Sequence, residues 1–317
     1  MPALSKAEQL TIRQLRIAAA IGDAGSLVGA AAILNVTQPT ISKALHELEV
    51  VVGAELFERT RRGVVPTPFG TALVRHAKLL ISQLRHAAEE LADLQDGTGG
   101  RVVVGTLLAA SARLLPRAIA QLRRERPRLS IQVIEGTNDV LIPALKSGDI
   151  DIVVGRLSEH RASRDLRHDV LLSEGACVVV RAGHPLAKKR RPKLADLAAS
   201  DWILPRTETT LRRQIDKDFA DAGIRLPASV IASVSFLTNR QLLLQDDYVT
   251  VWPRQVALEH IGRMEISILE IELPSTFGPI GISTRAGAIL SPSSEALIAA
   301  LHCAAEGLQA RPGAKGH

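Results

Sequence analysis

The stretch AAILNVTQPTISKALHELEVVVGAELFER, residues 31–59, decides the fold because it predicts a turn followed by a helix with one polar face. The turn falls at residues 34–36, and Thr37 is a favourable N-cap. Pro39 fits the first helical turn, where its missing N–H has no acceptor to lose. Apolar residues recur at helical spacing and predict a buried stripe: Ile41, Leu45, Leu48 and Val52.

The opposite face of this helix carries short hydrogen-bonding side chains and one cation: Gln38, Thr40, Ser42, Lys43 and His46. Such a face suits a helix that lies in the major groove of DNA and reads base edges. Taken alone, the stretch also fits an amphipathic helix pair in any small bundle.

The residues after the helix favour the DNA-binding interpretation. Residues 60–67 (TRRGVVPT) predict a short hairpin with Gly63 at its turn, and three arginines crowd its tip: Arg59, Arg61 and Arg62. A basic hairpin beside a recognition helix is a wing that can reach phosphates or a minor groove. Two earlier helices, one at residues 11–21 and one that Ser26 caps, complete a three-helix core.

This pattern resembles the N-terminal motif of LysR-type transcriptional regulators, and the resemblance is strong through residue 94. The matching residues are Ala31, Ala32, Leu34, Asn35, Val36, Thr37, Gln38, Pro39, Ile41, Ser42, Leu45, Leu48, Glu49, Gly53, Leu56, Phe57 and Arg59. One departure is the apolar run at residues 50–52, which affects packing more than DNA contact. The implied DNA-binding set is Ser26, Thr37, Gln38, Pro39, Thr40, Ser42, Lys43, His46, Arg59, Arg61 and Arg62.

The distribution of charge qualifies the nucleic-acid interpretation. The 317 residues, enough for two domains, carry a net charge of +6, but residues 1–70 hold seven Lys and Arg against six Asp and Glu. DNA binding is therefore expected from local placement and not from bulk charge. The densest basic run, KKRRPK at residues 188–193, is predicted to be a solvated loop, with an auxiliary role in DNA binding as the alternative.

The expected cellular compartment is inferred from two sequence features that are not found. No apolar run is long enough to span a bilayer, and the N-terminus has no apolar secretory core, so we expect a cytoplasmic protein without membrane contact. Cys177 and Cys303 are expected to be two buried free thiols, with a redox pair as the alternative.

A long helix is predicted from Pro68 to about Asp93, before a linker at residues 95–100 (QDGTGG). Its apolar residues form a heptad seam: Leu73, Ala77, Leu80, Leu84, Ala87, Leu91 and Leu94. Because such a seam needs a partner helix, we expect a dimer that holds two recognition helices roughly 34–36 Å, or a multiple of that distance, apart. The alternative is a single helix that lies on its own domain.

After the linker, strands and helices alternate. The predicted order is strand, helix, strand, helix and strand at residues 101–106, 111–124, 129–135, 138–147 and 151–155. This order predicts a parallel sheet wrapped by helices, with ligands at the carboxyl ends of the strands. A second α/β unit is predicted to begin near Glu174, and residues 311–317 are expected to be disordered.

Residues at the predicted strand ends form a candidate effector pocket. The set is Thr106, Leu107, Thr137, Asn138, Arg156, Pro205, Arg206, Thr207, Ser235, Leu237 and Thr238. Thr137 and Asn138 open a helix whose N–H groups suit a carboxylate or a sugar hydroxyl. The family resemblance implies that an Arg at the place of Arg156 often faces the effector. Singly, each position also fits helix capping or surface solvation.

The downstream half resembles, more loosely, the effector domain of the same family, which is similar to periplasmic solute-binding proteins. The implied fold class is an all-α winged helix-turn-helix N-terminal domain with a long linker helix, followed by a two-lobed α/β domain. We expect DNA binding at residues 1–67, a dimerisation helix at 68–96, an effector domain at 97–310 and a tail at 311–317.

The resemblance also implies partners. These are double-stranded promoter DNA, a small-molecule effector, a second copy of the chain in a homodimer or homotetramer, and RNA polymerase. The effector would be a sugar or an aromatic or organic acid, as in the branches that control sugar-binding-protein or aromatic-acid catabolic genes.

We find no catalytic, metal-binding or phosphate-binding motif, so we expect no enzyme, no cofactor and no metal. Asp149 and Asp151 are interpreted as a solvated strand edge, and His160 and His168 as loop residues without a partner. Two other classes stay open: a ligand-independent architectural DNA binder, and an enzyme built on a solute-binding-like domain.

Overall fold

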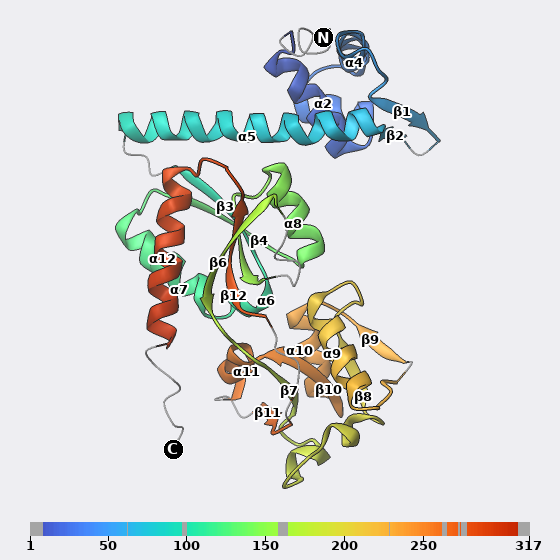
Figure 1. Ribbon diagram of the computed structural model, residues 1–317, viewed down its shortest axis with the longest axis vertical. Helices are drawn as coiled ribbons and strands as arrows, with labels where there is room; N and C mark the ends of the chain where they lie inside the picture. The colour runs from blue at the N-terminus through green and yellow to red at the C-terminus, as the bar shows by residue number, and fades with distance from the viewer. Residues whose placement is uncertain are drawn as a thin grey trace. The chain divides into compact units, whose positions relative to one another are not determined.

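The computed structural model describes residues 9–61, 63–96, 100–157, 164–227, 229–261, 265–271, 273 and 278–309. Arg62, His160 and the expected tail at 311–317 lie outside the described residues. The chain divides into one unit of Met1–Gly97 with Lys146–Asp149 and a second of Thr98–Leu145 with Ile150–His317. Figure 1 shows the elements along the chain.

The described part of the first unit begins with the helices α2 (Ile12–Ala24), α3 (Leu27–Leu34) and α4 (Gln38–Val52). Gly25, in the left-handed region at φ 60°, ends α2, and the Ser26 hydroxyl caps α3 by accepting the N–H of Gly29 at 3.0 Å. Thr37 is the N-cap of α4 but makes no side-chain capping bond, since its hydroxyl lies 2.8 Å from that of Thr40. Buried side chains from all three helices share one core: Ile17, Ala18, Ile21, Leu27, Ala30, Ile41, Leu45 and Leu48.

A two-stranded hairpin follows, β1 (Phe57–Thr60) and β2 (Gly63–Pro66). It begins earlier than the predicted residue 60, because the Glu49 carboxylate accepts the N–H of Leu56 at 2.8 Å and so holds the chain where β1 starts. Gly63 pairs with Thr60 at the end of the ladder, and the N–H of Val64 binds the Gly25 carbonyl at 2.8 Å. The hairpin is thus anchored on the turn between α2 and α3.

The long helix α5 (Pro68–Asp96) runs past the predicted end, so residues 95 and 96 are helical and not linker. Its start is confined by Gly70, where a Cβ would lie 1.9 Å from the Leu56 carbonyl oxygen, so no other residue fits. Leu73 and Ala77 pack with Leu15 and Ala19 of α2. The first three turns of α5 therefore contribute to the core of the helical domain.

The first lobe of the second unit holds a five-stranded sheet in the order β4-β3-β5-β12-β6. The strands are β3 (Arg101–Thr106), β4 (Ser130–Glu135), β5 (Ile152–Arg156), β6 (Leu166–Leu172) and β12 (Ile280–Arg285). The helices are α6 (Leu108–Ser111), α7 (Leu114–Glu125), α8 (Asn138–Ser147) and α12 (Pro292–Gln309). The expected parallel pairs are present, but β12 runs antiparallel to β5 and β6, so the sheet is mixed.

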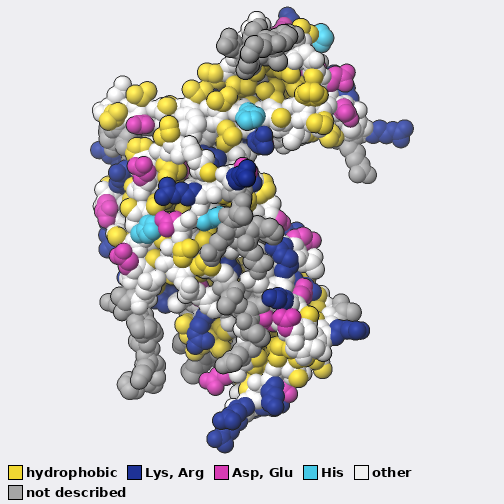
Figure 2. Space-filling model, viewed as in Figure 1, with side chains coloured by type: hydrophobic (Ala, Val, Ile, Leu, Met, Phe, Trp, Pro, Cys, Tyr) yellow, Lys and Arg dark blue, Asp and Glu magenta, His cyan; other side chains and the backbone are white. Residues whose placement is uncertain are grey.

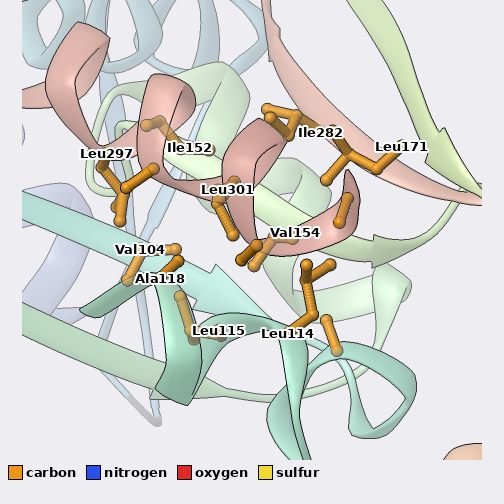
Figure 3. Packing of buried hydrophobic residues seen from close by; sticks show 14 of the residues in the cluster. Val104, Leu114, Leu115, Ala118, Ile152, Val154, Leu171, Ile282, Leu297 and Leu301 are labelled. Carbon is orange, nitrogen blue, oxygen red and sulfur yellow. The ribbon is translucent and has the colours of Figure 1, made fainter. Parts of the chain in front are cut away.

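Helices α7 and α12 cover one face of this sheet, as the close view in Figure 3 shows. The labelled side chains that pack there are Val104, Leu114, Leu115, Ala118, Ile152, Val154, Leu171, Ile282, Leu297 and Leu301. The predicted helix at 111–124 is present as α7, but it starts three residues later than predicted, and a separate short helix, α6, ends at Ser111.

The second lobe holds a sheet in the order β11-β7-β10-β8-β9. Its strands are β7 (Ala176–Arg181), β8 (Asp201–Leu204), β9 (Val230–Ala232), β10 (Tyr248–Pro253) and β11 (Ile266–Leu269). Its helices are η1 (Pro185–Lys188), η2 (Leu194–Leu197), α9 (Thr210–Asp221), α10 (Phe236–Gln245) and α11 (Arg254–Ile261). Trp202 and Phe219 meet edge to face in its core, with ring centroids 5.5 Å apart.

The chain crosses between the lobes twice, at residues 173–175 after β6 and again between β11 and β12. This confirms the predicted fold class, a winged helical domain followed by a two-lobed α/β domain. Lys and Arg side chains gather at one tip of the second lobe in Figure 2, where residues 188–191 and Lys193 are exposed. Within the described residues, no helix is both long and apolar enough to cross a membrane.

Three smaller expectations are wrong. Asp151 is 3% exposed, because its carboxylate accepts the N–H of Val103 at 2.8 Å. His168 lies in β6, with its Nδ1 2.8 Å from the Ser283 hydroxyl oxygen, so it has a partner. Cys177 is buried as expected, but Cys303 is exposed on α12.

Candidate DNA interface and effector site

The outward face of α4 is open to solvent along its first two turns. Gln38, Pro39, Lys43 and His46 are exposed, and Thr40 and Ser42 are half-buried. Lys43 Nζ lies 3.9 Å from Glu47 Oε1, and both side chains are exposed. This long ion pair therefore holds Lys43 only weakly. These side chains can therefore reach a ligand without repacking of the domain. Ser26 differs, because its hydroxyl already caps α3.

A groove of about 630 Å³ lies between α4 and the hairpin. Ser42, His46 and Arg59 line it together with three carboxylates: Glu49, Glu55 and Glu58. The carboxylates disfavour a phosphate inside the groove, and the basic side chains lie instead at the hairpin tip. Arg59 and Arg61 are exposed there, and Figure 2 shows basic side chains projecting from this end of the hairpin.

The heptad seam of α5 divides into two parts. Leu73 and Ala77 pack against side chains of the helical domain. Beyond them the seam is a stripe of exposed apolar residues: Leu80 at 52%, Leu84 at 46%, Leu91 at 62% and Leu94 at 79%, with Ala87 also exposed. An exposed apolar stripe of this kind is typical of a protein contact surface.

In the first lobe, most of the candidate effector residues already take part in hydrogen bonds with backbone groups. The Thr106 side chain is buried and donates to the Leu107 carbonyl at 3.3 Å, and the Leu107 N–H binds the Val154 carbonyl at 3.1 Å. The Thr137 carbonyl accepts the N–H groups of Val140 and Leu141 in α8. Asn138 is half-buried, and its amide donates to the Arg156 carbonyl at 3.4 Å.

On the second lobe, the candidates are more exposed. Arg206 reaches across to the first lobe, where its Nη2 lies 3.2 Å from Asp139 Oδ2 at the start of α8. Pro205 accepts from Arg212 through its carbonyl, and the Thr207 hydroxyl donates to Glu208 at 3.3 Å. The Ser235 hydroxyl accepts the Thr238 N–H and so caps α10, while Leu237 is 68% exposed. The Arg206–Asp139 pair is what brings the two halves of the predicted set together.

Arg156 has a different environment from the rest of the predicted set. It is 6% exposed, and its Nη1 donates to the carbonyls of Glu174 at 3.1 Å and Gly278 at 2.6 Å. Burial lowers the pKa of this guanidinium, while the Glu174 carboxylate acts in the opposite direction. Burial raises the pKa of Glu174, against the Gln255 N–H, Arg156 and Arg113. Sequence reasoning missed Glu174, because its partners are up to 81 residues away and leave no local pattern.

Among the described residues there is no cluster of three His, Cys, Asp or Glu side chains that could hold a metal ion. A helix-turn-helix with a basic wing, a long apolar-striped helix and a two-lobed ligand domain together define a DNA-binding regulator.

Comparison with known proteins gives the family. The description "Bacterial regulatory helix-turn-helix protein, lysR family" matches residues 12–71, and "LysR substrate binding domain" matches residues 95–306. The transcriptional regulator GbpR of Azospirillum brasilense is 35% identical over 299 residues, which cover 94% of this chain and 87% of GbpR. The regulator PcaQ of Agrobacterium fabrum is 29% identical, over 88% of this chain and 90% of PcaQ.

Solved structures agree on the fold. A full-length OxyR variant from Pseudomonas aeruginosa has a TM-score of 0.69 at 24% identity, over 97% of this chain and 99% of OxyR. Full-length CbnR complexed with its target DNA has a TM-score of 0.64 at 20% identity, over 93% of this chain and 100% of CbnR. The chain belongs to the LysR family of bacterial transcriptional regulators, which confirms the expected family and function.

Proposed function

We propose that this regulator reads promoter DNA with the outward face of α4 and contacts phosphates with the hairpin tip. The observation that carries the proposal is the pairing of hydrogen-bonding side chains on the outward face of α4, exposed Gln38 and half-buried Ser42 among them, with exposed Arg59 and Arg61. Short polar side chains at a helix N-terminus discriminate bases, and arginines supply the salt-dependent part of the affinity. Residues 1–67 would form the DNA-binding domain.

The exposed leucines of α5 support a dimer formed by pairing this helix with its copy. Removing Leu80, Leu84, Leu91 and Leu94 from water in two chains supplies a favourable apolar contact. Residues 68–96 would then act as the dimerisation helix. Two recognition helices held this way select a two-part site.

The experiment that tests DNA reading is selection of duplexes from a random library by the full-length protein. We expect a recurrent sequence of two related half-sites whose centres lie roughly 34–36 Å, or a multiple of it, apart. Recovery of duplexes with no shared sequence would contradict the proposal and favour an architectural DNA binder.

For residues 97–310 we propose an effector domain whose ligand enters between the lobes, near Arg206, Asp139 and Asn138. A cation beside amide and hydroxyl groups suits a carboxylate or a polyhydroxylated molecule. Thermal unfolding of the full-length protein against organic acids, aromatic carboxylates and monosaccharides tests this. A true effector at 100 times its dissociation constant should stabilise by about 2.7 kcal/mol. RNA polymerase is the further partner that transcriptional control would require.

A further inference from the structure

One guanidinium joins both crossings between the lobes. Arg156 ends β5 in the first lobe, and its Nη1 donates to Glu174 in the first crossing and to Gly278 just before β12, where the chain returns. Both acceptors are backbone carbonyls. A change in the angle between the lobes that moves either carbonyl relative to β5 would disturb these bonds.

The side chain of Glu174 extends the same connection into the second lobe. Its Oε1 accepts the N–H of Gln255, near the start of α11. Its Oε2 has no hydrogen-bond partner within the described part of the chain, so the carboxylate is held through one oxygen and by nearby positive charge. Glu174 is 9% exposed, and a buried carboxylate held so sparingly is sensitive to small movements of its surroundings.

Arg113 links this hydrogen-bond network back to the first lobe. It precedes α7, and its Nη1 donates to Gln255 Oε1 at 2.7 Å while its Nε lies 2.9 Å from Glu259 Oε1. Leu108 and Ala112, also of the first lobe, pack against the second-lobe cluster around Trp252. The network from Arg156 through Glu174 and Gln255 to Arg113 therefore passes through both crossings and both lobes.

We propose that Arg156 and Glu174 are positioning residues that set the angle between the two lobes. The proposal assigns Arg156 to the hinge and not to direct recognition of the effector. Its functional consequence rests on the effector-domain proposal above, but the hinge itself is tested without effector or DNA.

The test measures the distance between spin labels on the two lobes of the full-length protein. One label is attached to the exposed Cys303 on α12 and the other to a cysteine introduced by Lys217→Cys, at an exposed position of α9. Labelled protein is diluted with unlabelled protein so that each oligomer carries one labelled chain. We expect one narrow distance distribution in the parent, and a broadened or shifted distribution in both Arg156→Met and Glu174→Ala.

Arg285 is a matched control. Its Nη1 also donates to two backbone carbonyls, those of Leu145 and Ile150, but both belong to the first lobe. Arg285→Met should lower the unfolding temperature and leave the distance distribution unchanged. Arg156→Lys, which keeps the charge, should restore part of the parent distribution.

Parent-like distributions in folded Arg156→Met and Glu174→Ala would overturn the proposal, as would an equal broadening in Arg285→Met. If Arg156→Met does not fold, Glu174→Ala and Arg156→Lys decide the result. Because no DNA or effector is present, failure of the effector-domain proposal leaves this measurement intact, and the reverse also holds.

Discussion

Arg206 Nη2 lies 3.2 Å from Asp139 Oδ2, so an ion pair links the loop after β8 in the second lobe to the first turn of α8 in the first. The two side chains are 48% and 35% exposed, so solvent screens the pair and it should contribute under about 1 kcal/mol to stability. At the effector site proposed above, an anionic effector near α8 would compete with Asp139 for Arg206.

Asp139→Asn should therefore raise the affinity for a carboxylate effector, up to about fivefold if the released pair is worth about 1 kcal/mol. The affinity for a neutral sugar should not change. Calorimetric titration of the best carboxylate and the best sugar from the thermal panel measures both. Asp221→Asn, at an exposed position on α9, is the control. Equal gains for both ligands would mean that Asp139 does not compete for charge.

Leu84→Glu should weaken the dimer, because a carboxylate would be buried in an apolar seam without a partner. We expect the dimer dissociation constant to rise more than about tenfold, which corresponds to 1.4 kcal/mol. Analytical ultracentrifugation over a range of concentrations gives this constant. Thr71→Glu adds the same charge at an exposed position near the start of α5 and should not alter it. An unchanged association in Leu84→Glu would show that α5 does not form the interface.

Glu174→Gln should stabilise the protein at neutral pH. Burial raises the pKa of Glu174 above its usual 4.5, against the Gln255 N–H, Arg156 and Arg113, so the folded state binds this proton more tightly than the unfolded state does. The contribution of this proton to the free energy of unfolding is full below the pKa that Glu174 has in the unfolded state. It is lost as the pH rises through the higher pKa of the folded state. Glutamine keeps an acceptor for the Gln255 N–H and carries no charge.

Denaturant unfolding from pH 4.5 to pH 8 checks this prediction. The free energy of unfolding of Glu174→Gln should fall less over this range than that of the parent, whereas exposed Glu270→Gln should follow the parent. If the free energies of unfolding of Glu174→Gln and of the parent change in parallel with pH, then ionisation of the Glu174 carboxylate does not destabilise the folded state.

The two thiols should differ in reactivity. Burial raises the pKa of the Cys177 thiol to about 12, with Arg254 opposing and Glu174 assisting, whereas Cys303 is exposed. Since the thiolate is the reactive form, its fraction at Cys177 is on the order of one in ten thousand at pH 8. A maleimide reagent should label one thiol rapidly in the native protein, and Cys303→Ser should abolish that phase. Two rapid thiols, or a disulfide, would contradict this assignment.

The helix-turn-helix could be predicted because its signals are local. Gly25, Ser26 and Gly53 mark helix ends through their own backbone or side-chain preferences, and the stripe of Ile41 and Leu48 is periodic. Strand β6 could not be predicted in the same way, because LRHDVLL has a mixed pattern and its partner β12 lies more than 100 residues later. Helix α11 starts directly after Pro253, and because proline is typical of a turn, the local sequence does not predict this helix.

The candidate site residues also differ in whether a local sequence pattern can predict them. Exposed residues of α4 could be named from a helical pattern. The surroundings of Arg156 depend on Glu174 and Gly278, which only the two chain crossings bring together. Asp151 likewise became a buried acceptor through its contact with Val103, 48 residues earlier, and no alternation of polar residues indicates such a contact.

The most direct test of the account is the affinity of Gln38→Ala and Ser42→Ala for a selected duplex and for a scrambled duplex of equal length, at one salt concentration. Each lost base contact should cost about 1–3 kcal/mol on the selected duplex, roughly a 5- to 150-fold weaker affinity, and leave binding to the scrambled duplex unchanged. Gln132→Ala, which removes an exposed glutamine from β4, should change neither. Parent-like affinity of both α4 variants for the selected duplex would contradict the claim that this face of α4 reads the promoter.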